Sequence, residues 1–147
     1  MDPGYVATHL EEDERHWWFL GRRAVLRSVL RAALPRGDLS VAEIGCGSGA
    51  FLPVAAEFGG VVGVEASADF LEAARRRGFT VLPGSLPDQL PLAAESFDAA
   101  LLFDVLEHIE DDQGALRAVA RILRPGGLLL CTVPAYQIGR ASCRERV

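Results

Sequence analysis

Residues 41–49 read VAEIGCGSG, an apolar run that leads into a glycine-rich turn. The run predicts a strand over 39–44, and the residues after the turn predict a helix that continues to about residue 58. Glycine lets such a turn close sharply and lets a ligand come within contact distance of the backbone. The start of the helix is expected to supply free N–H groups and a positive dipole end, which suit a carboxylate or a phosphate. The stretch therefore predicts a ligand-binding turn.

The alternation of short apolar runs and helical stretches continues along the chain. Further strands are expected over 61–65, 79–82, 97–103 and 128–133, and further helices over 68–77 and 112–123. Strands that alternate with helices at these lengths indicate βαβ crossovers, which place the strands in a parallel sheet with helices on both faces. The predicted fold class is therefore α/β, a three-layer αβα arrangement around a doubly wound, mostly parallel sheet.

An acidic residue stands where the second strand is expected to end. Glu65 follows Gly45 by 20 residues, a spacing typical of a carboxylate that accepts hydrogen bonds from ribose hydroxyls. A solvated charge at a strand end is the alternative interpretation. Gly45, Gly47 and Ala50 also satisfy the G-x-G-x-x-A pattern of dinucleotide enzymes, so these features alone leave the ligand open.

The N-terminal region 8–34 predicts two helical pieces. An apolar stripe in the second piece is expected to face the core, with arginines on the opposite face. The stripe is Val25, Leu26, Val29, Leu30 and Ala33, and the arginines are Arg23, Arg27 and Arg31.

Composition limits the classes of protein that remain. The chain has 147 residues, 50% of them hydrophobic, and a formal net charge of −5. This size favours one domain, and no apolar run approaches the roughly 20 residues that cross a bilayer. The acidic charge and the lack of a basic stripe argue against a nucleic-acid partner. Cys46, Cys131 and Cys143 show no metal-ligand spacing, so no metal site is expected. Because the N-terminal region is acidic rather than basic, we expect a cytoplasmic protein without a signal peptide.

The last ten residues, 138–147, read IGRASCRERV and follow neither a strand nor a helix period. The codons ATC GGA AGA GCG TCG TGT AGG GAA AGA GTG, a common short-read sequencing adapter, translate in frame to this decapeptide. Our hypothesis is that the native reading ends near Tyr136 and that the rest is a processing artefact. A natural basic tail is the alternative.

The stretch 41–133 resembles the class I, Rossmann-like S-adenosylmethionine-dependent methyltransferases, particularly the small-molecule group that includes quinone-biosynthesis enzymes. Glu43, two residues before Gly45, is similar to the start of the family motif E/D-x-G-x-G-x-G. The segments FDAALLFDVLEHIED (97–111) and ALRAVARILRPGGLLL (115–130) resemble the fourth and fifth strands with their connections. HWWFLGRR (16–23) is similar to an aromatic helix that many members place over the cofactor.

The resemblance implies S-adenosylmethionine as cofactor and a set of contacts to it. The turn would meet the methionine part through its backbone, and Glu65 would bind the ribose. Glu43 would help to order the turn and would reach the ammonium of the cofactor through water. Residues 66–67 and 85–86 would lie beside the adenine, and residues 103–105 near the sulfonium, although core packing is the alternative for Phe103 and Val105. The implied cofactor-binding residues are Glu43, Gly45, Cys46, Gly47, Gly49, Glu65, Ala66, Ser67, Ser85, Leu86, Phe103, Asp104 and Val105.

One position departs from the family pattern. After the third strand, members usually have an acidic residue that accepts the adenine amino group, and here the matching residues are Gly84, Ser85 and Leu86. A hydroxyl accepts that bond less strongly than a carboxylate. Asp88 could substitute if the loop bends back.

Aromatic, basic and imidazole side chains complete the candidate site. Residues 16–19 are interpreted either as a lid that keeps water from the methyl donor or as an aromatic face docked into the core. Arg22 and Arg23 would clamp the methionine carboxylate, or else form a solvated face. His108 is the candidate catalytic residue, because an imidazole can remove a proton from a methyl acceptor. A structural histidine is the alternative.

The predicted organisation is a helical lid over 1–38, an S-adenosylmethionine-binding methyltransferase core over 39–136 with five of the usual seven strands, and a non-native tail over 137–147. The predicted reaction transfers a methyl group to a small-molecule acceptor. The alternatives are an NAD(P)-dependent oxidoreductase, a non-catalytic cofactor-binding subunit and an aminopropyltransferase. Glu43 and the LRPGG turn at 123–127 argue against the oxidoreductase.

Overall fold

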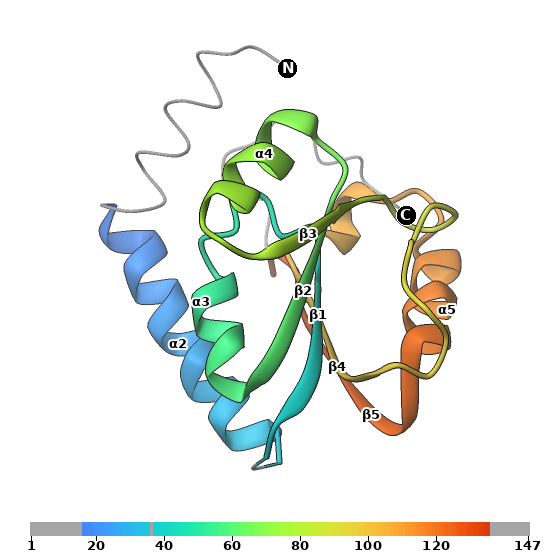
Figure 1. The fold of residues 1–147 in the computed structure, drawn as a ribbon, viewed down its shortest axis with the longest axis horizontal. Helices are drawn as coiled ribbons and strands as arrows, with labels where there is room; N and C mark the ends of the chain where they lie inside the picture. The colour runs from blue at the N-terminus through green and yellow to red at the C-terminus, as the bar shows by residue number, and fades with distance from the viewer. Residues whose placement is uncertain (1–15, 36, 136–147) are drawn as a thin grey trace.

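The computed structural model describes residues 16–35 and 37–135, and a parallel five-stranded sheet forms its centre (Figure 1). The strands are β1 (Leu39–Ile44), β2 (Gly59–Glu65), β3 (Thr80–Pro83), β4 (Phe97–Phe103) and β5 (Leu123–Thr132). They lie in the order β3-β2-β1-β4-β5, and each neighbouring pair is parallel. The predicted α/β fold with a doubly wound parallel sheet is confirmed. The first helical piece expected before residue 16 and the tail 138–147 lie outside the described residues.

Helices cover both faces of the sheet. They are α2 (Trp17–Ala33), α3 (Leu52–Ala55), α4 (Ala68–Arg76) and α5 (Asp112–Ile122). Side chains of a strand alternate between the two faces, so Val41 packs in a cluster with Leu30 of α2, and Ala42 packs in a cluster with Ile122 of α5. Figure 1 shows α2 and α3 on one side of the sheet and α5 on the other. Among residues 16–35 and 37–135, no helix has the length and hydrophobicity that a membrane span requires.

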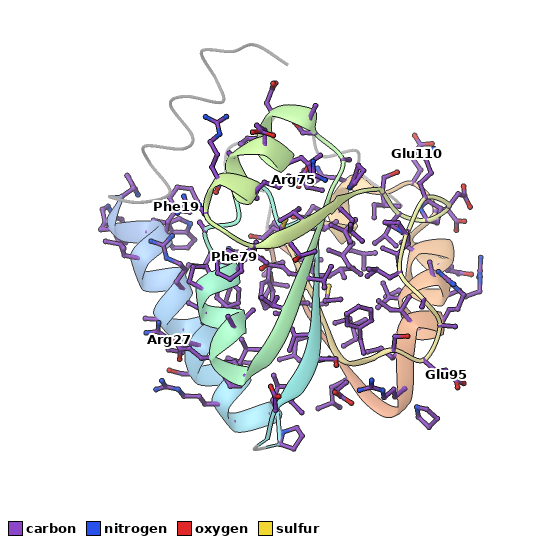
Figure 2. All side chains as sticks on the ribbon, in the orientation of Figure 1. Phe19, Arg27, Arg75, Phe79, Glu95 and Glu110 are labelled. Atoms are coloured by element: carbon purple, nitrogen blue, oxygen red, sulfur yellow. The ribbon has the colours of Figure 1, made fainter. Side chains whose placement is uncertain are left out.

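The face that α2 turns toward the sheet differs from the predicted one. Leu26, Leu30 and Leu34 are buried, whereas Val25 and Val29 are exposed. The leucines supply the reason, because they repeat every four residues along one face of the helix and pack in the cluster against the sheet. Beside this face, Arg27 and Arg31 form ion pairs at 2.7 and 3.1 Å with Glu57 in the turn η1 (Ala56–Phe58). These ion pairs join the arginine-bearing side of α2 to η1 (Arg27 is labelled in Figure 2). The predicted apolar stripe is therefore wrong in part.

The helix after the glycine turn is shorter than predicted. α3 is a single turn, and η1 follows it directly. β2 begins at Gly59 because this residue pairs in register with Leu39. Gly59 has a φ of +147°, and a Cβ there would collide with the backbone of Leu39, so glycine fixes this junction.

β5 also begins earlier than predicted. Leu123 already pairs with Phe97, and the register shifts before Leu128 pairs with Ala99. The residues 125–127 therefore form an irregularity inside the strand rather than a turn before it. The other predicted elements begin and end within two residues of the observed ones.

Candidate functional site

Several chain segments meet at the carboxyl edge of the sheet, next to the point where the strand order reverses between β1 and β4. Open α/β sheets bind ligands at this switch point. The glycine turn 45–49 follows β1, Glu65 ends β2, Asp104 follows β4 and Thr132 ends β5. α2, which packs on one face of the sheet, contributes Arg22.

The three glycines of the turn have positive φ angles of +72°, +55° and +73° at Gly45, Gly47 and Gly49. Side chains on the first and third would collide with the protein, since a Cβ on Gly45 would lie 2.5 Å from Val105 and one on Gly49 would lie 2.9 Å from Ala74. A Cβ on Gly47 would meet nothing within 4 Å among the described residues. Gly47 is therefore the glycine of the turn beside which a ligand has space.

Glu65 is buried against this turn. Its Oε2 accepts a hydrogen bond from the N–H of Gly47 at 2.8 Å, and its Oε1 accepts one from the N–H of Ser67 at 2.8 Å. The interpretation of Glu65 as a solvated charge is wrong, because the residue is 9% exposed. An ionised carboxylate offers about four acceptor positions, so two remain for ribose hydroxyls.

The backbone N–H groups of the turn are largely occupied. Those of Gly45 and Cys46 both donate to the carbonyl of Val64, and that of Gly49 donates to the carbonyl of Cys46. α3 is too short to add the dipole of a longer helix. The prediction of free N–H groups for a carboxylate or a phosphate is therefore not met at Gly45, Cys46 and Gly49.

Glu43 occupies a buried position in β1, just before the turn. Its side chain is 4% exposed, and Oε2 has no hydrogen-bond partner among the described residues. Burial raises the pKa of Glu43 to about 8, and the guanidinium of Arg22 partly opposes this rise.

Arg22 and Asp104 join α2 to the end of β4. The guanidinium lies 2.7 Å from Oδ2 of Asp104 and 6.0 Å from the centroid of the Phe103 ring. The Thr132 hydroxyl donates to Oδ1 of Asp104 at 2.8 Å, and the backbone N–H of Asp104 donates to the carbonyl of Thr132. Asp104 has a φ of +58°, a left-handed conformation held by these contacts. The interpretation of Arg22 as part of a solvated face is wrong.

The remaining residues expected beside the cofactor are arranged around this centre. Val105 and Leu86 are partly buried against the core cluster on the α5 side, and the Phe103 ring packs edge-on against Phe51 at 5.0 Å. Ala66 is exposed, and Ser67 is half-buried next to Glu65. The loop after β3 does bend back, since Ser85 and Gln89 exchange backbone hydrogen bonds. Asp88 is exposed within this bend.

The aromatic residues at the start of α2 lie in the helical turn before Arg22, which reaches this edge of the sheet. Trp17 is 73% exposed and Trp18 is 56% exposed, so the docking of these two rings into the core is wrong. Phe19 is half-buried (labelled in Figure 2), and Nδ1 of His16 accepts a hydrogen bond from the backbone N–H of Trp18 at 3.3 Å. The lid interpretation stays a prediction.

The described cysteines and His108 can be placed as well. Cys46 and Cys131 are free thiols, and the described part of the chain holds no cluster of metal-ligating side chains. Burial raises the pKa of the Cys46 thiol, and the nearby Glu43 and Glu65 raise it further, so it stays protonated. His108 is exposed in the turn η2 (Leu106–His108) beyond β4. Cys143 lies outside the described residues.

Two contacts at the site, besides that of Arg22 with Asp104, were not expected from the sequence. The Thr132 hydroxyl holds Asp104, and the Nε–H of Arg77 donates to the carbonyl of Ser48 at 2.9 Å, which ties the glycine turn to the end of α4. Both join residues that are far apart in the chain. The only sequence signal for the first was that β4 and β5 would end at the same edge of a parallel sheet.

A family model described as a methyltransferase domain matches residues 42–131. The chain belongs to the methyltransferase domain family. A ubiquinone biosynthesis O-methyltransferase of Cereibacter sphaeroides is 35% identical over 109 residues, which cover 70% of this chain and 44% of the relative. The chain thus spans less than half the length of this curated relative.

Solved structures agree with this membership in the methyltransferase domain family. An S-adenosylmethionine-dependent methyltransferase from Mesorhizobium loti is 37% identical with a TM-score of 0.61, and the match covers 69% of this chain and 50% of that one. A Thermotoga maritima structure is described as a SAM-dependent methyltransferase, possible histamine N-methyltransferase. It is 32% identical with a TM-score of 0.65, and covers 85% of this chain and 58% of that one.

The cofactor implied by these comparisons is S-adenosylmethionine. The residues of the methyltransferase domain fit it, because Oε2 of Glu43 lacks a partner and the space beside Gly47 is open. Charge also fits. Glu43, Glu65 and Asp104 surround the edge with carboxylates, whereas S-adenosylmethionine carries a sulfonium and an ammonium against a single carboxylate.

Proposed function

We propose that this domain binds S-adenosylmethionine at the carboxyl edge of the sheet and serves a methyltransferase that acts on a small molecule. The observation that carries the proposal is the excess of carboxylates at the edge. Glu43 and Glu65 are buried there, and Asp104 forms an ion pair with Arg22. Such a site favours a cationic ligand.

In this proposal, each residue binds a distinct part of the cofactor. Glu65 keeps its bonds to the turn and accepts the ribose hydroxyls with its remaining lone pairs. Gly47 lets the ligand approach the backbone. Glu43 and Asp104 face the ammonium group, and Arg22, which has five N–H donors, extends some of them to the ligand carboxylate.

The chemistry of transfer places few demands on the protein. When bound, the sulfonium supplies an already activated methyl group, so the protein contributes by positioning the acceptor in line and by excluding water. The exposure of Trp17 and Trp18 at the start of α2 supports a role for them as part of a lid over the edge. His108 is the candidate group that takes the acceptor proton.

A hydroxyl-bearing small molecule is the proposed acceptor. Its support is the printed function of the relative from Cereibacter sphaeroides, an O-methyltransferase of ubiquinone biosynthesis. Loss of the imidazole in His108→Ala would slow methylation of a hydroxyl acceptor near pH 7, and the deficit would shrink at higher pH as the acceptor ionises by itself.

Two observations disfavour the nicotinamide alternative. A dinucleotide brings an anionic pyrophosphate, which Rossmann enzymes bind at the N-terminus of a helix. Here α3 has only one turn, and the N–H groups of Gly45, Cys46 and Gly49 are engaged within the protein.

Titration calorimetry of the 147-residue chain with S-adenosylhomocysteine and with NAD tests the proposal. We expect saturable binding of S-adenosylhomocysteine and no measurable heat with NAD. Binding of NAD in preference to S-adenosylhomocysteine would overturn the assignment of the ligand.

A further inference from the structure

Glu43 has a buried oxygen without a hydrogen-bond partner among the described residues of the site. Its side chain lies on the α2 side of the sheet, where β1 is in register with Leu101 of β4. The buried oxygen is Oε2. A buried carboxylate oxygen without a hydrogen-bond partner makes the anion costly, so Glu43 either holds a proton or requires a cation.

The charged and titratable groups around Glu43 do not supply that cation in full. Arg22 on α2 acts on Glu43, but its guanidinium is already bonded to Asp104 after β4 at 2.7 Å. Cys46 in the turn and Glu65 at the end of β2 are neutral or negative, so neither offsets a charge on Glu43. Two carboxylates therefore compete for one guanidinium.

We propose that Glu43 carries a proton in the ligand-free protein and releases it to solvent when the ammonium group of the bound ligand takes its place beside Oε2. The inference rests on the proposed function, because it requires a ligand with an amino-acid end. It is in accord with the direction in which burial moves the pKa of Glu43, to about 8.

The exchange is balanced without any further reactant. The O–H bond of Glu43 breaks, the proton passes to a buffer base, and an N–H of the ammonium donates to the carboxylate instead. Because binding then competes with a proton, the Kd for S-adenosylhomocysteine falls about tenfold for each unit of pH between about 5.5 and 7.5. Binding becomes independent of this group above its pKa.

Calorimetry in buffers of different ionisation enthalpy counts the protons released on binding. At about pH 6.5 we expect close to one proton per S-adenosylhomocysteine bound, since Glu43 is then almost fully protonated. Methylthioadenosine, which keeps the nucleoside but lacks the amino-acid end, should bind without proton release. Glu43→Gln should abolish the release with S-adenosylhomocysteine. Tight binding of S-adenosylhomocysteine without proton release would overturn the inference but leave the proposed function standing.

The pH dependence of stability tests the same proton without a ligand. The folded protein holds the proton on Glu43 up to about pH 8, whereas an unfolded chain loses it near the ordinary value of about 4.3. The free energy of unfolding of the native chain therefore falls, relative to Glu43→Gln, as pH rises through this window. The difference stays constant above and below it. If the difference in the free energy of unfolding between the native chain and Glu43→Gln does not change with pH, the inference is overturned, whether or not S-adenosylhomocysteine binds. Failure of S-adenosylhomocysteine to bind would instead count against the proposed function.

Discussion

At the scale of single residues, the glycines of the turn differ in what a side chain would meet. Alanine at either Gly45 or Gly47 forces a positive φ that costs about 1–2 kcal/mol. Gly45→Ala adds a collision with Val105 at 2.5 Å, whereas Gly47→Ala points its methyl into open space. The two substitutions therefore separate folding from binding.

We predict that Gly45→Ala lowers the free energy of unfolding more than Gly47→Ala does. We further predict that Gly47→Ala weakens S-adenosylhomocysteine binding about tenfold or more, because a lost contact of roughly 1.4 kcal/mol has that effect. Denaturant unfolding and calorimetry on both variants give the comparison. Unchanged affinity in Gly47→Ala would place the ligand away from the turn.

Glu65 has a role in stability as well as in binding. Glu65→Gln replaces an acceptor oxygen by an amide N–H₂, which cannot accept from the N–H of Gly47 or Ser67. We predict a loss of about 1–3 kcal/mol in the free energy of unfolding and a cofactor affinity about tenfold or more weaker. Glu72→Gln on the exposed side of α4 is the matched control. A variant with native stability and affinity would show that neither role exists.

At the scale of elements, α2 is held to the sheet by its leucines. Leu30 is fully buried, whereas Val29, its neighbour in sequence, is 46% exposed. We predict that Leu30→Ala costs about 2–4 kcal/mol in the free energy of unfolding, whereas Val29→Ala changes it by less than about 0.5 kcal/mol. Thermal unfolding of the two variants decides this. Equal losses would mean that α2 docks through the stripe predicted from the sequence.

The elements that depend on local pattern could be predicted from the sequence. β1 and β4 have the predicted limits, because buried parallel strands form continuous apolar runs. The face of α2 could be predicted only in part, because Val25 and Val29 extend the apolar pattern and only the packing against the sheet leaves them exposed. The short α3 and the early start of β5 follow from strand register, which no local pattern reveals.

The candidate site divides in the same way. The glycine turn and Glu65 have a sequence signature, and the structure brings them together at 2.8 Å. The contact of Arg22 with Asp104 joins residues separated by 82 positions and needed the folded chain to be seen. The lack of a hydrogen-bond partner for Oε2 of Glu43 could not be predicted either, because it depends on the positions of all the side chains around it.

At the scale of the whole molecule, β5 forms one edge of the described sheet. Leu128 and Val133 are exposed there, and the outer backbone groups of the strand have no neighbouring strand among the described residues. An apolar unpaired edge promotes pairing between chains. We predict that the 147-residue chain self-associates and that Val133→Lys reduces this association.

Light scattering over a range of protein concentrations measures the effect of Val133→Lys. Val25→Lys, on the exposed side of α2, is the control, because it adds the same charge away from the edge. A native chain that stays monomeric would refute the prediction, and equal effects of both substitutions would show that β5 is not the contact.

The central claim is that the carboxyl edge of this methyltransferase domain binds S-adenosylmethionine through the glycine turn and its carboxylates. A crystal structure of the chain with S-adenosylhomocysteine tests it most directly. We predict the ribose hydroxyls within hydrogen-bond distance of Glu65, the nucleoside side of the ligand against Gly47, and the ammonium beside Oε2 of Glu43. Ligand density elsewhere on the protein, with this edge empty at saturating ligand, would contradict the account.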